Sequence, residues 1–383
     1  MCCSSAEPRK IPAAPGRGWG IGGLRLPSPF LLAPMAGVTD RPFRAMAIAE
    51  GAALTYSEMA SAAALSHRGK KTIRLLSHHG ENVPFAVQLF GKLPSELAEA
   101  ARIATLEHGA SLIDINMACP ARKVLRSGHG AALLSQPSLC LGLCESVARA
   151  VDVPLTVKCR PGLAPPEGGR EPQVYELAKG LESAGVRAVA LHPRYASQGF
   201  RGQADWSLVK GLSERVGITV IGSGDIDSPE SALLRLKDSG ASLVMLGRAV
   251  RGRPWLFGQC LDLLGEGSYS EPTLSQRLGH ALRHARLEHD ELGPRAVFPL
   301  RSILPWYIKG LPGASGFRDR ICHEADFGRQ LDIVTEAFER AMRAGDGDGA
   351  EGDMGAQGAR TGPSGHMARG GANGGERDGE GAS

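Results

Sequence analysis

Reactive and hydrogen-bonding residues stand at the ends of a series of short apolar runs along the chain. These residues are Met35, Glu58, Gln88, Asn116, Cys119, Lys158, Arg160, His192, Ser223, Gly224, Asp225, Gly247 and Arg248. An amide such as Gln88 can donate and accept at once, which suits the polar edge of a heterocycle, although a hydrogen-bonded core amide would give the same pattern. Polar chemistry is therefore concentrated at one kind of position.

Lys158 and Cys119 carry the most reactive groups. Lys158 lies within an apolar run, where a lysine must find an anionic or electron-rich partner or lower its pKa. An ion pair with a neighbouring acid such as Glu58 is the alternative. Cys119 follows the run that ends at Asn116, and a thiol there can deliver a proton or attack a carbon. No other Cys or His stands close enough to Cys119 for a metal site, so we expect no metal.

Two glycine-containing segments favour phosphate binding. Residues 221–225 read IGSGD and residues 246–249 read LGRA. Backbone N–H groups approach an anion closely where side chains are small, and Arg248 adds a fork of donors. The alternative is that the two segments are ordinary glycine-containing turns between a strand and a helix. The position of both segments after the last two of eight runs nevertheless predicts a phosphate site.

The elements that must position these residues repeat as apolar run, loop and helical segment. The eight runs lie at 31–35, 53–57, 85–89, 112–116, 155–160, 188–192, 218–222 and 243–247. Helix-period segments lie at 94–108, 137–150, 173–184 and 229–239. Such alternation predicts a parallel sheet buried on both faces, and eight units predict an α/β fold of the (β/α)8 TIM-barrel type. An open doubly wound sheet is the alternative, but it needs no eight equivalent units.

A small all-α domain is expected after the barrel. We place the catalytic barrel at 30–262 and the helical domain at 273–343, with helices at 273–292, about 296–308 and 328–343. Segment 295–320 interleaves basic and aromatic residues, which are Arg295, Arg301, Lys309, Arg318, Arg320, Phe298, Trp306, Tyr307 and Phe317. These aromatic residues could face a ligand or form the core of the domain.

Composition limits the remaining possibilities. The 383 residues are 42% hydrophobic and 22% charged, which excludes a wholly disordered chain. Residues 344–383 contain 14 glycines in 40 positions, and we expect a disordered tail there. Residues 1–29 form an N-terminal extension without the apolar core of a secretory signal. No run of 18 apolar residues exists, so a transmembrane helix is not expected. Eight scattered cysteines predict reduced thiols and a cytoplasmic location.

The motifs, taken in order, resemble those of the tRNA-dihydrouridine synthases over about residues 30–340, most closely the bacterial B-type subgroup. They are APMAGVTDRPFR at 33–44, AVQLFG at 86–91, DINMACPARKV at 114–124, VKCR at 157–160, the His192 segment, SGDI at 223–226, and GRA at 247–249 with GRPW at 252–255. Arg301 and Trp306-Tyr307 continue the likeness into the helical end. The resemblance implies an FMN-dependent barrel whose helical domain holds tRNA.

The resemblance also implies the reaction and its residues. NADPH (or NADH) reduces FMN, and the flavin reduces the C5–C6 double bond of a uridine in tRNA. Cys119 would be the general acid, Asn116 and Arg160 would contact the uracil edge, and Arg301 and Lys309 would bind the tRNA. The implied cofactor residues are Pro34, Met35 and Ala36 against the ring, Gln88 and Lys158 at its polar edge, and His192, Ser223, Gly224, Asp225, Gly247 and Arg248 around the phosphate.

Four positions depart from the family pattern, and two other functions remain open. Ala118 and Pro193 stand where glycine is usual, Ser223 replaces Asn, and Ala196 replaces Arg. If the backbone before Cys119 needed a positive φ, Ala118 would shift the thiol. The alternatives are an FMN barrel acting on a small molecule and a catalytically silent RNA-binding relative. We expect a monomer with tRNA as partner and no membrane.

Overall fold

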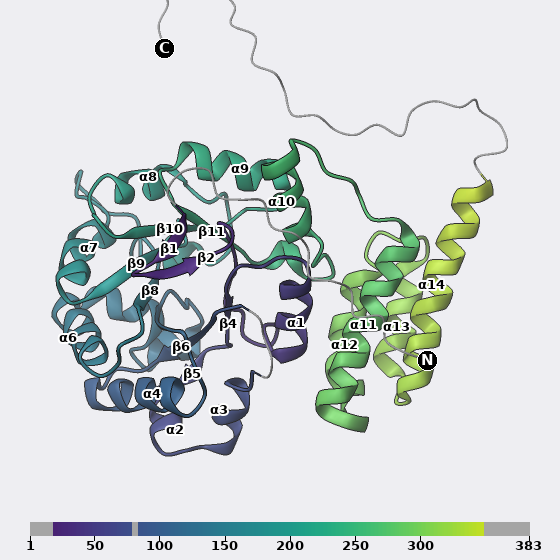
Figure 1. The fold of residues 1–383 in the computed structure, drawn as a ribbon, viewed down its shortest axis with the longest axis horizontal. Helices are drawn as coiled ribbons and strands as arrows, with labels where there is room; N and C mark the ends of the chain where they lie inside the picture. The colour runs from purple at the N-terminus through teal and green to yellow at the C-terminus, as the bar shows by residue number, and fades with distance from the viewer. Residues whose placement is uncertain (1–17, 79–82, 348–383) are drawn as a thin grey trace, which may run out of the picture.

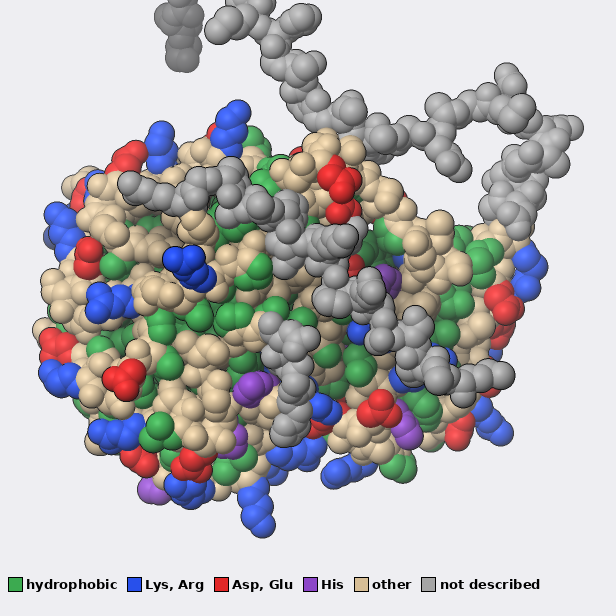
Figure 2. Space-filling model, in the orientation of Figure 1, with side chains coloured by type: hydrophobic (Ala, Val, Ile, Leu, Met, Phe, Trp, Pro, Cys, Tyr) green, Lys and Arg blue, Asp and Glu red, His purple; other side chains and the backbone are tan. Residues whose placement is uncertain are grey.

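The structure, a computed structural model, describes residues 18–78 and 83–347, with side chains described to residue 344. It consists of a barrel and a helical domain beside it (Figure 1). Acidic and basic side chains are interspersed around the outline of the molecule in Figure 2, as expected for a net charge of +4. The predicted tail lies outside the described residues from 348 onward.

Eight parallel strands close into a barrel. They are β3 (Phe30–Leu32), β4 (Thr55–Tyr56), β6 (Phe85–Phe90), β7 (Leu112–Met117), β8 (Leu155–Cys159), β9 (Val186–Leu191), β10 (Thr219–Ser223) and β11 (Leu243–Leu246). The first strand pairs with the last, since β3 is hydrogen-bonded to β11. Backbone bonds from Ala53 N to Phe30 O (2.9 Å) and from Leu32 N to Leu54 O (3.0 Å) join β3 to β4. The predicted (β/α)8 fold is confirmed.

Helices cover the outside of the barrel. They are α1 (Arg41–Ala49), α2 (Ala62–Ser66), α3 (Lys70–Leu75), α4 (Pro94–Leu106), α5 (Arg122–Arg126), α6 (Pro137–Ala148), α7 (Gln173–Ser183), α8 (Ser207–Ser213), α9 (Pro229–Asp238) and α10 (Leu256–Glu266), with a two-residue strand β5 (Ala60–Ser61) before α2. Side-chain caps start some of them: Asp40 Oδ1 accepts from Phe43 N at 2.9 Å. No single described helix is long and apolar enough to cross a membrane, and only the bent pair 122–135 and 137–148 reaches that length and hydropathy together.

The interior of the barrel contains an apolar cluster of small and branched side chains such as Leu31, Ala190 and Ile221. The barrel is closed at the amino ends of its strands. A hairpin of β1 (Trp19–Ile21) and β2 (Leu24–Leu26) covers this end and buries Ile21 against the same cluster. The sequence prediction contained no element in residues 1–29, because strands of three residues show no measurable periodicity.

The helical domain has its own core. Its helices are α11 (Leu274–Leu292), α12 (Val297–Tyr307), α13 (Ala314–His323) and α14 (Phe327–Gly347), of which α13 was not predicted. Tyr307 and Phe317 are buried in this core, whereas Phe298 is 62% exposed. Trp306 packs against both the barrel core and the helical core. Most of the interleaved aromatic residues are therefore structural, and Phe298 is the exposed one.

The two parts meet tightly at Gly252, and its substitution tests that junction. Gly252 has φ +68°, and a Cβ there would lie 2.5 Å from the carbonyl carbon and oxygen of Trp306. We expect Gly252→Ala to lower the free energy of unfolding by about 2–4 kcal/mol, because backbone strain and overpacking add. Gly267→Ala, at φ +73° with no atom within 4 Å of the new Cβ, should cost about 1 kcal/mol. Chemical denaturation measures both, and equal losses would contradict the tight junction.

Candidate active site at the carboxyl ends of the barrel strands

A buried network of one carboxylate and two amides lies just below the barrel mouth. Asp114 accepts hydrogen bonds from Gln88 Nε2 and Thr156 Oγ1, each at 2.6 Å. Gln88 Oε1 accepts from Asn116 Nδ2 at 2.8 Å. Because a carboxylate only accepts, it orients Gln88, which in turn orients Asn116. Burial raises the pKa of Asp114 to about 6, although these bonds and the charge of Lys158 oppose the rise. We call Gln88, Asp114, Asn116 and Thr156 the mouth network.

The mouth network holds the loop that carries Cys119. Asn116 Oδ1 accepts from the backbone N–H groups of Ala118 (3.2 Å) and Cys119 (3.0 Å). The carbonyl of Ala118 accepts from Arg160 Nε at 2.8 Å, and that of Cys119 accepts from Ala131 N at 3.2 Å. The thiol of Cys119 is partly exposed, whereas Asn116 and Arg160 are buried. Cys119 thus lies at the mouth on a loop whose backbone N–H and C=O groups at Ala118 and Cys119 are all hydrogen-bonded.

Gly130 packs directly behind this loop. It has φ +60°, and a Cβ there would lie 2.8 Å from the carbonyl oxygen and 3.0 Å from the Cβ of Cys119. Among the described non-glycine residues, positive φ occurs only at Arg68 and Asp225. Ala118 therefore adopts an ordinary backbone conformation, and the departure from glycine before Cys119 causes no strain.

Lys158 extends from β8 beside the mouth network. Its side chain is 9% exposed and forms no hydrogen bond or ion pair with another described residue. Burial lowers the pKa of Lys158 to about 8, although the nearby charge of Asp114 opposes the shift. The alternative partner, Glu58, instead accepts from Gly37 N in the loop after β3. Lys158 is therefore available for an anionic or electron-rich ligand.

Arg160 braces two loops. Its Nη1 donates to the carbonyls of Arg194 (3.1 Å), Tyr195 (3.1 Å) and Gly199 (2.9 Å), in addition to the bond from Nε to Ala118. Burial lowers the pKa of Arg160 to about 10, so the guanidinium stays charged. The predicted contact of Arg160 with a substrate base therefore depends on its remaining nitrogen, Nη2.

Cationic and neutral donors gather at the ends of β9, β10 and β11. Within the described part of the chain, His192 Nε2 and Arg194 Nη1 are buried without a hydrogen-bond partner. Arg194 Nη2 lies 2.5 Å from Asp225 Oδ2, and Arg248 Nη2 lies 3.7 Å from Asp225 Oδ1. Burial and the surrounding cations lower the pKa of His192 to about 2, so its imidazole is neutral. A Cβ at Gly224 would lie 3.0 Å from the His192 ring, which explains the glycine.

The acid in this group is held ionised. Partial burial would raise the pKa of Asp225, but bonds from Arg194 and the backbone N–H of Ala204 hold it below its usual value. Arg194 was missed by sequence reasoning, although it stands two residues after His192. Phe200 was also missed: it is 57% exposed, and its ring lies 4.7 Å from the Arg248 guanidinium. The loop that contains Arg194 and Phe200 has no apolar run or periodicity in the sequence that would have pointed to them.

The loop after β3 completes the rim. Thr39 Oγ1 accepts from Met35 N at 3.1 Å, and the surface of Pro34, Met35 and Ala36 remains at least partly exposed. A Cβ at Gly247 would lie 3.7 Å from Ala33 Cβ and 4.0 Å from Met35 Sδ, so the first and last strand loops adjoin. The structure thus gathers at one mouth the predicted residues Pro34, Met35, Ala36, Gln88, Asn116, Cys119, Lys158, Arg160, His192, Ser223, Gly224, Asp225, Gly247 and Arg248.

Two predicted substrate residues lie elsewhere, in the helical domain. Arg301 Nη2 donates to the carbonyl of Glu324 at 3.1 Å, and its guanidinium lies 5.5 Å from the Phe298 ring. Lys309 is exposed just after α12. Neither belongs to the mouth, and their contact with tRNA stays a prediction.

The donors at the mouth suit a phosphate and the electron-rich edge of a ring. Arg194 Nη1 is an unpartnered donor, and His192 Nε2 is an unpartnered ring nitrogen that donates when it carries the proton; with the half-exposed Arg248 they suit an oxyanion. Lys158 supplies an unpaired ammonium on the neighbouring strand. These groups would hold an anion at one side of the mouth and an electron-rich edge at the other.

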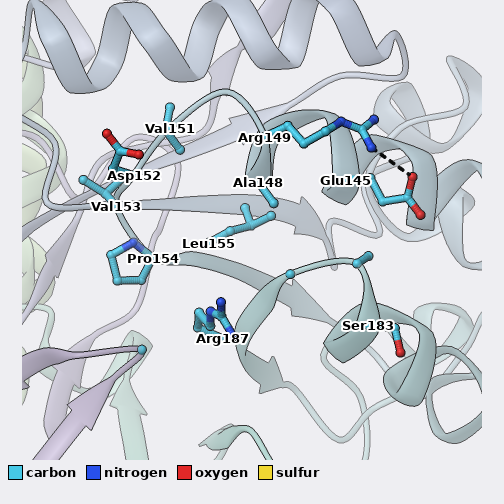
Figure 3. Close-up of a pocket in the computed structure, with 13 residues that line it drawn as sticks. Glu145, Ala148, Arg149, Val151, Asp152, Val153, Pro154, Leu155, Ser183 and Arg187 are labelled. Carbon is cyan, nitrogen blue, oxygen red and sulfur yellow. Dashed lines mark ion pairs between the residues drawn. The ribbon is translucent and has the colours of Figure 1, made fainter.

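A cavity lies at the opposite end of the barrel. It has a volume of about 600 Å³ and is lined by residues from the ends of α6 and α7 and the starts of β8 and β9. Figure 3 shows Asp152 and Arg187 at its wall and an ion pair between Arg149 and Glu145 (3.6 Å). The unpaired and buried functional groups described above are absent from this wall, and reactive groups in this fold lie at the carboxyl ends of the strands.

The chain is similar to known proteins over most of its length. The family model described as "Dihydrouridine synthase (Dus)" matches residues 31–343. The tRNA-dihydrouridine synthase B of Xanthomonas campestris pv. campestris is 37% identical over 85% of this chain and 97% of its own length. The protein of the same name from Vibrio parahaemolyticus is 38% identical over 78% and 92%, and that from Escherichia coli K12 is 37% identical over 83% and 98%.

The position of Cys119 can be tested through Gly130. We expect Gly130→Ala to change the rate of Cys119 alkylation by iodoacetamide about fivefold or more, because the new Cβ overlaps the cysteine backbone. Gly128→Ala is the matched control, since it has φ +76° and no atom within 4 Å of the new Cβ. Mass spectrometry of the Cys119 peptide gives both rates. Equal rates in the two variants would remove Gly130 from this role.

Proposed function

The chain belongs to the dihydrouridine synthase family, and on that premise we propose that it is a flavin-dependent enzyme that reduces the C5–C6 double bond of uridines in tRNA to dihydrouridine. We further propose FMN as cofactor and NADPH, or NADH, as electron donor. The observation that carries this proposal is the partly exposed Cys119 at the same mouth as the unpaired Lys158 and His192. Bound FMN would supply the hydride that is added to C6 of the uracil.

Lys158 is suited to holding the cofactor's polar edge. Its ammonium group has no acidic partner at hydrogen-bond distance among the described residues, so its charge is free to act on a ligand. A positive charge beside the N1 and O2 side of the ring favours the form that carries negative charge. A ligand with negative charge at this edge would also keep Lys158 protonated, because it offsets the burial that lowers the lysine pKa.

Cys119 is suited to delivering the proton that completes the reduction. Once C6 of the uracil had accepted a hydride, negative charge would develop on the base, and the Cys119 thiol would give its proton to C5 as the S–H bond breaks. The resulting thiolate regains a proton from solvent, which the partial exposure of Cys119 permits. Asn116 and Arg160 hold the Cys119 loop in place, since Asn116 accepts from the N–H of Cys119 and Arg160 donates to the carbonyl of Ala118.

The surroundings of the mouth suit RNA. Exposed cations lie on α5 directly after the Cys119 loop, at Arg122, Lys123 and Arg126. Lys309 adds an exposed cation on the helical domain, and the exposed Phe298 ring lies beside Arg301. Cations bind phosphates and an exposed ring can stack on an unpaired base, so these groups would hold the strand while one uridine is turned into the barrel.

The role of Cys119 is tested by Cys119→Ala. We expect the variant to bind FMN and to be reduced by NADPH at the normal rate, but to form dihydrouridine in tRNA at least about 100-fold more slowly, because the acid is lost. Cys322→Ala, which removes the other partly exposed described thiol, should leave product formation unchanged. Nucleoside mass spectrometry of tRNA measures the product, and normal product formation by Cys119→Ala would contradict this role.

The role of Lys158 is tested by Lys158→Met. We expect the midpoint potential of bound FMN to fall by about 30–60 mV, a ten- to hundredfold loss of preference for the reduced form of a two-electron couple. The physical reason is the loss of the positive charge that stabilises the reduced ring. Lys179→Met, at an exposed position on α7, should not change the potential. Spectroelectrochemical titration gives the values, and an unchanged potential in Lys158→Met would place the lysine away from the ring.

A further inference from the structure

Three metal-binding side chains meet where the barrel joins the helical domain. Asp40 stands just before α1, and His284 and Glu288 lie one turn apart on α11, which packs against α1 (Figure 1). One ligand atom from each residue lies within 4.8 Å of the others. His284 and Glu288 are 0% and 1% exposed, and Asp40 is half-buried. None of the three belongs to the mouth network or to the groups proposed to bind FMN.

Two buried atoms of this cluster have no hydrogen bond. His284 Nε2 and Glu288 Oε1 face each other at 3.6 Å, and neither has a hydrogen-bond partner among the described residues. Leaving buried polar atoms unpaired is costly, and such atoms usually mark a partner such as an ion. The unpaired atoms therefore point to a ligand between them.

The other nitrogen of His284 is already fixed. Its Nδ1 lies 3.0 Å from the hydroxyl of Tyr307, which is fully buried in the helical core. A hydrogen bond to the second ring nitrogen is the arrangement that orients histidine ligands of metals. Phe43 packs against the His284 ring at 5.6 Å between centroids, so the half-buried Asp40 side provides the way in.

The charge around the cluster favours a cation. Glu58 and Glu291 act on it as further acids, while Arg41 is engaged with Glu291 at 2.5 Å. Arg44 donates to the carbonyls of Thr39 and Ser77. The carboxyl groups of Asp40 and Glu288 are hydrogen-bonded to each other, so two acids face the same space beside His284. A divalent cation would neutralise both.

We propose that Asp40, His284 and Glu288 bind a divalent transition-metal ion, for which Zn²⁺ is the best match. Zinc binds imidazole nitrogen and carboxylate oxygen at about 2.0–2.2 Å, which sets neighbouring ligand atoms roughly 3.4 Å apart. The 3.6 Å between His284 Nε2 and Glu288 Oε1 is already close to this value. Mg²⁺ fits poorly because it requires oxygen ligands. This proposal departs from the sequence expectation of no metal, which rested on the residues around Cys119.

The ion would join α11 to the start of α1. Asp40 also caps α1 through Phe43 N, and it follows the loop of Pro34, Met35 and Ala36 by a few residues. The ion would therefore hold that loop and the helical domain in one position. This inference does not depend on the proposed reaction, since it concerns residues away from the mouth.

Metal titration of the full-length protein tests the site. After treatment with a chelator, isothermal titration calorimetry with Zn²⁺ should give one ion bound per chain, with Mn²⁺ weaker and Mg²⁺ without effect. Glu288→Gln and Asp40→Asn should each weaken Zn²⁺ binding roughly 100-fold, because a charged ligand is lost. Both replacements keep the side-chain size, and Asn still caps a helix, so folding is checked by circular dichroism. Zn²⁺ should also raise the melting temperature of the parent protein but not that of Glu288→Gln.

Controls separate this site from other Zn²⁺ ligands. Asp290→Asn removes an exposed acid of α11 that is not part of the cluster, and His289→Gln changes the histidine that stacks on Phe327. Both should bind Zn²⁺ as the parent protein does. The proposal is overturned if the parent protein binds no Zn²⁺, or if binding persists in Glu288→Gln and Asp40→Asn and is abolished by thiol alkylation.

Discussion

The buried carboxylate of Asp114 determines the arrangement of the mouth. It can only accept hydrogen bonds, so the amide of Gln88 must turn its nitrogen toward it and its oxygen toward Asn116. Asn116 then presents its own oxygen to the backbone of Cys119. The donor and acceptor in each of these hydrogen bonds are therefore set by the bond from Gln88 to Asp114. Burying this charge is unfavourable, as the raised pKa of Asp114 shows, and the network of donors around it offsets that cost.

The barrel separates stability from chemistry along its axis. The amino end is closed by the β1–β2 hairpin, which buries Ile21 against an apolar cluster inside the barrel. The carboxyl-end half holds the mouth network, with Lys158 and Arg160 beside it. Unpaired polar groups such as Lys158 lie at the carboxyl-end part of the barrel. Their desolvation is unfavourable, and the burial of apolar side chains elsewhere in the barrel offsets it.

Most of the fold could be predicted from the sequence, because the buried parallel strands are continuous apolar runs and each is followed by a helix. The positions at the strand ends were predicted for the same reason. Asp114 was missed as a functional residue because it lies inside such a run, and its importance depends on contacts with neighbouring strands. Arg194 and Phe200 lie in a loop without periodicity, and α13 is too short to stand out. The Asp40–His284–Glu288 cluster joins distant segments, which only the tertiary structure brings together.

Trp306 belongs to the packing of two hydrophobic cores, and Gly252 lets its backbone lie directly on the barrel. Because the Trp306 side chain belongs to both cores, unfolding of the helical domain is coupled to unfolding of the barrel. The same packing holds the helical domain at a fixed distance from the Cys119 thiol. In the proposed reaction with tRNA, a strand bound to the helical domain would reach the barrel with the nucleotide that lies at this distance along it.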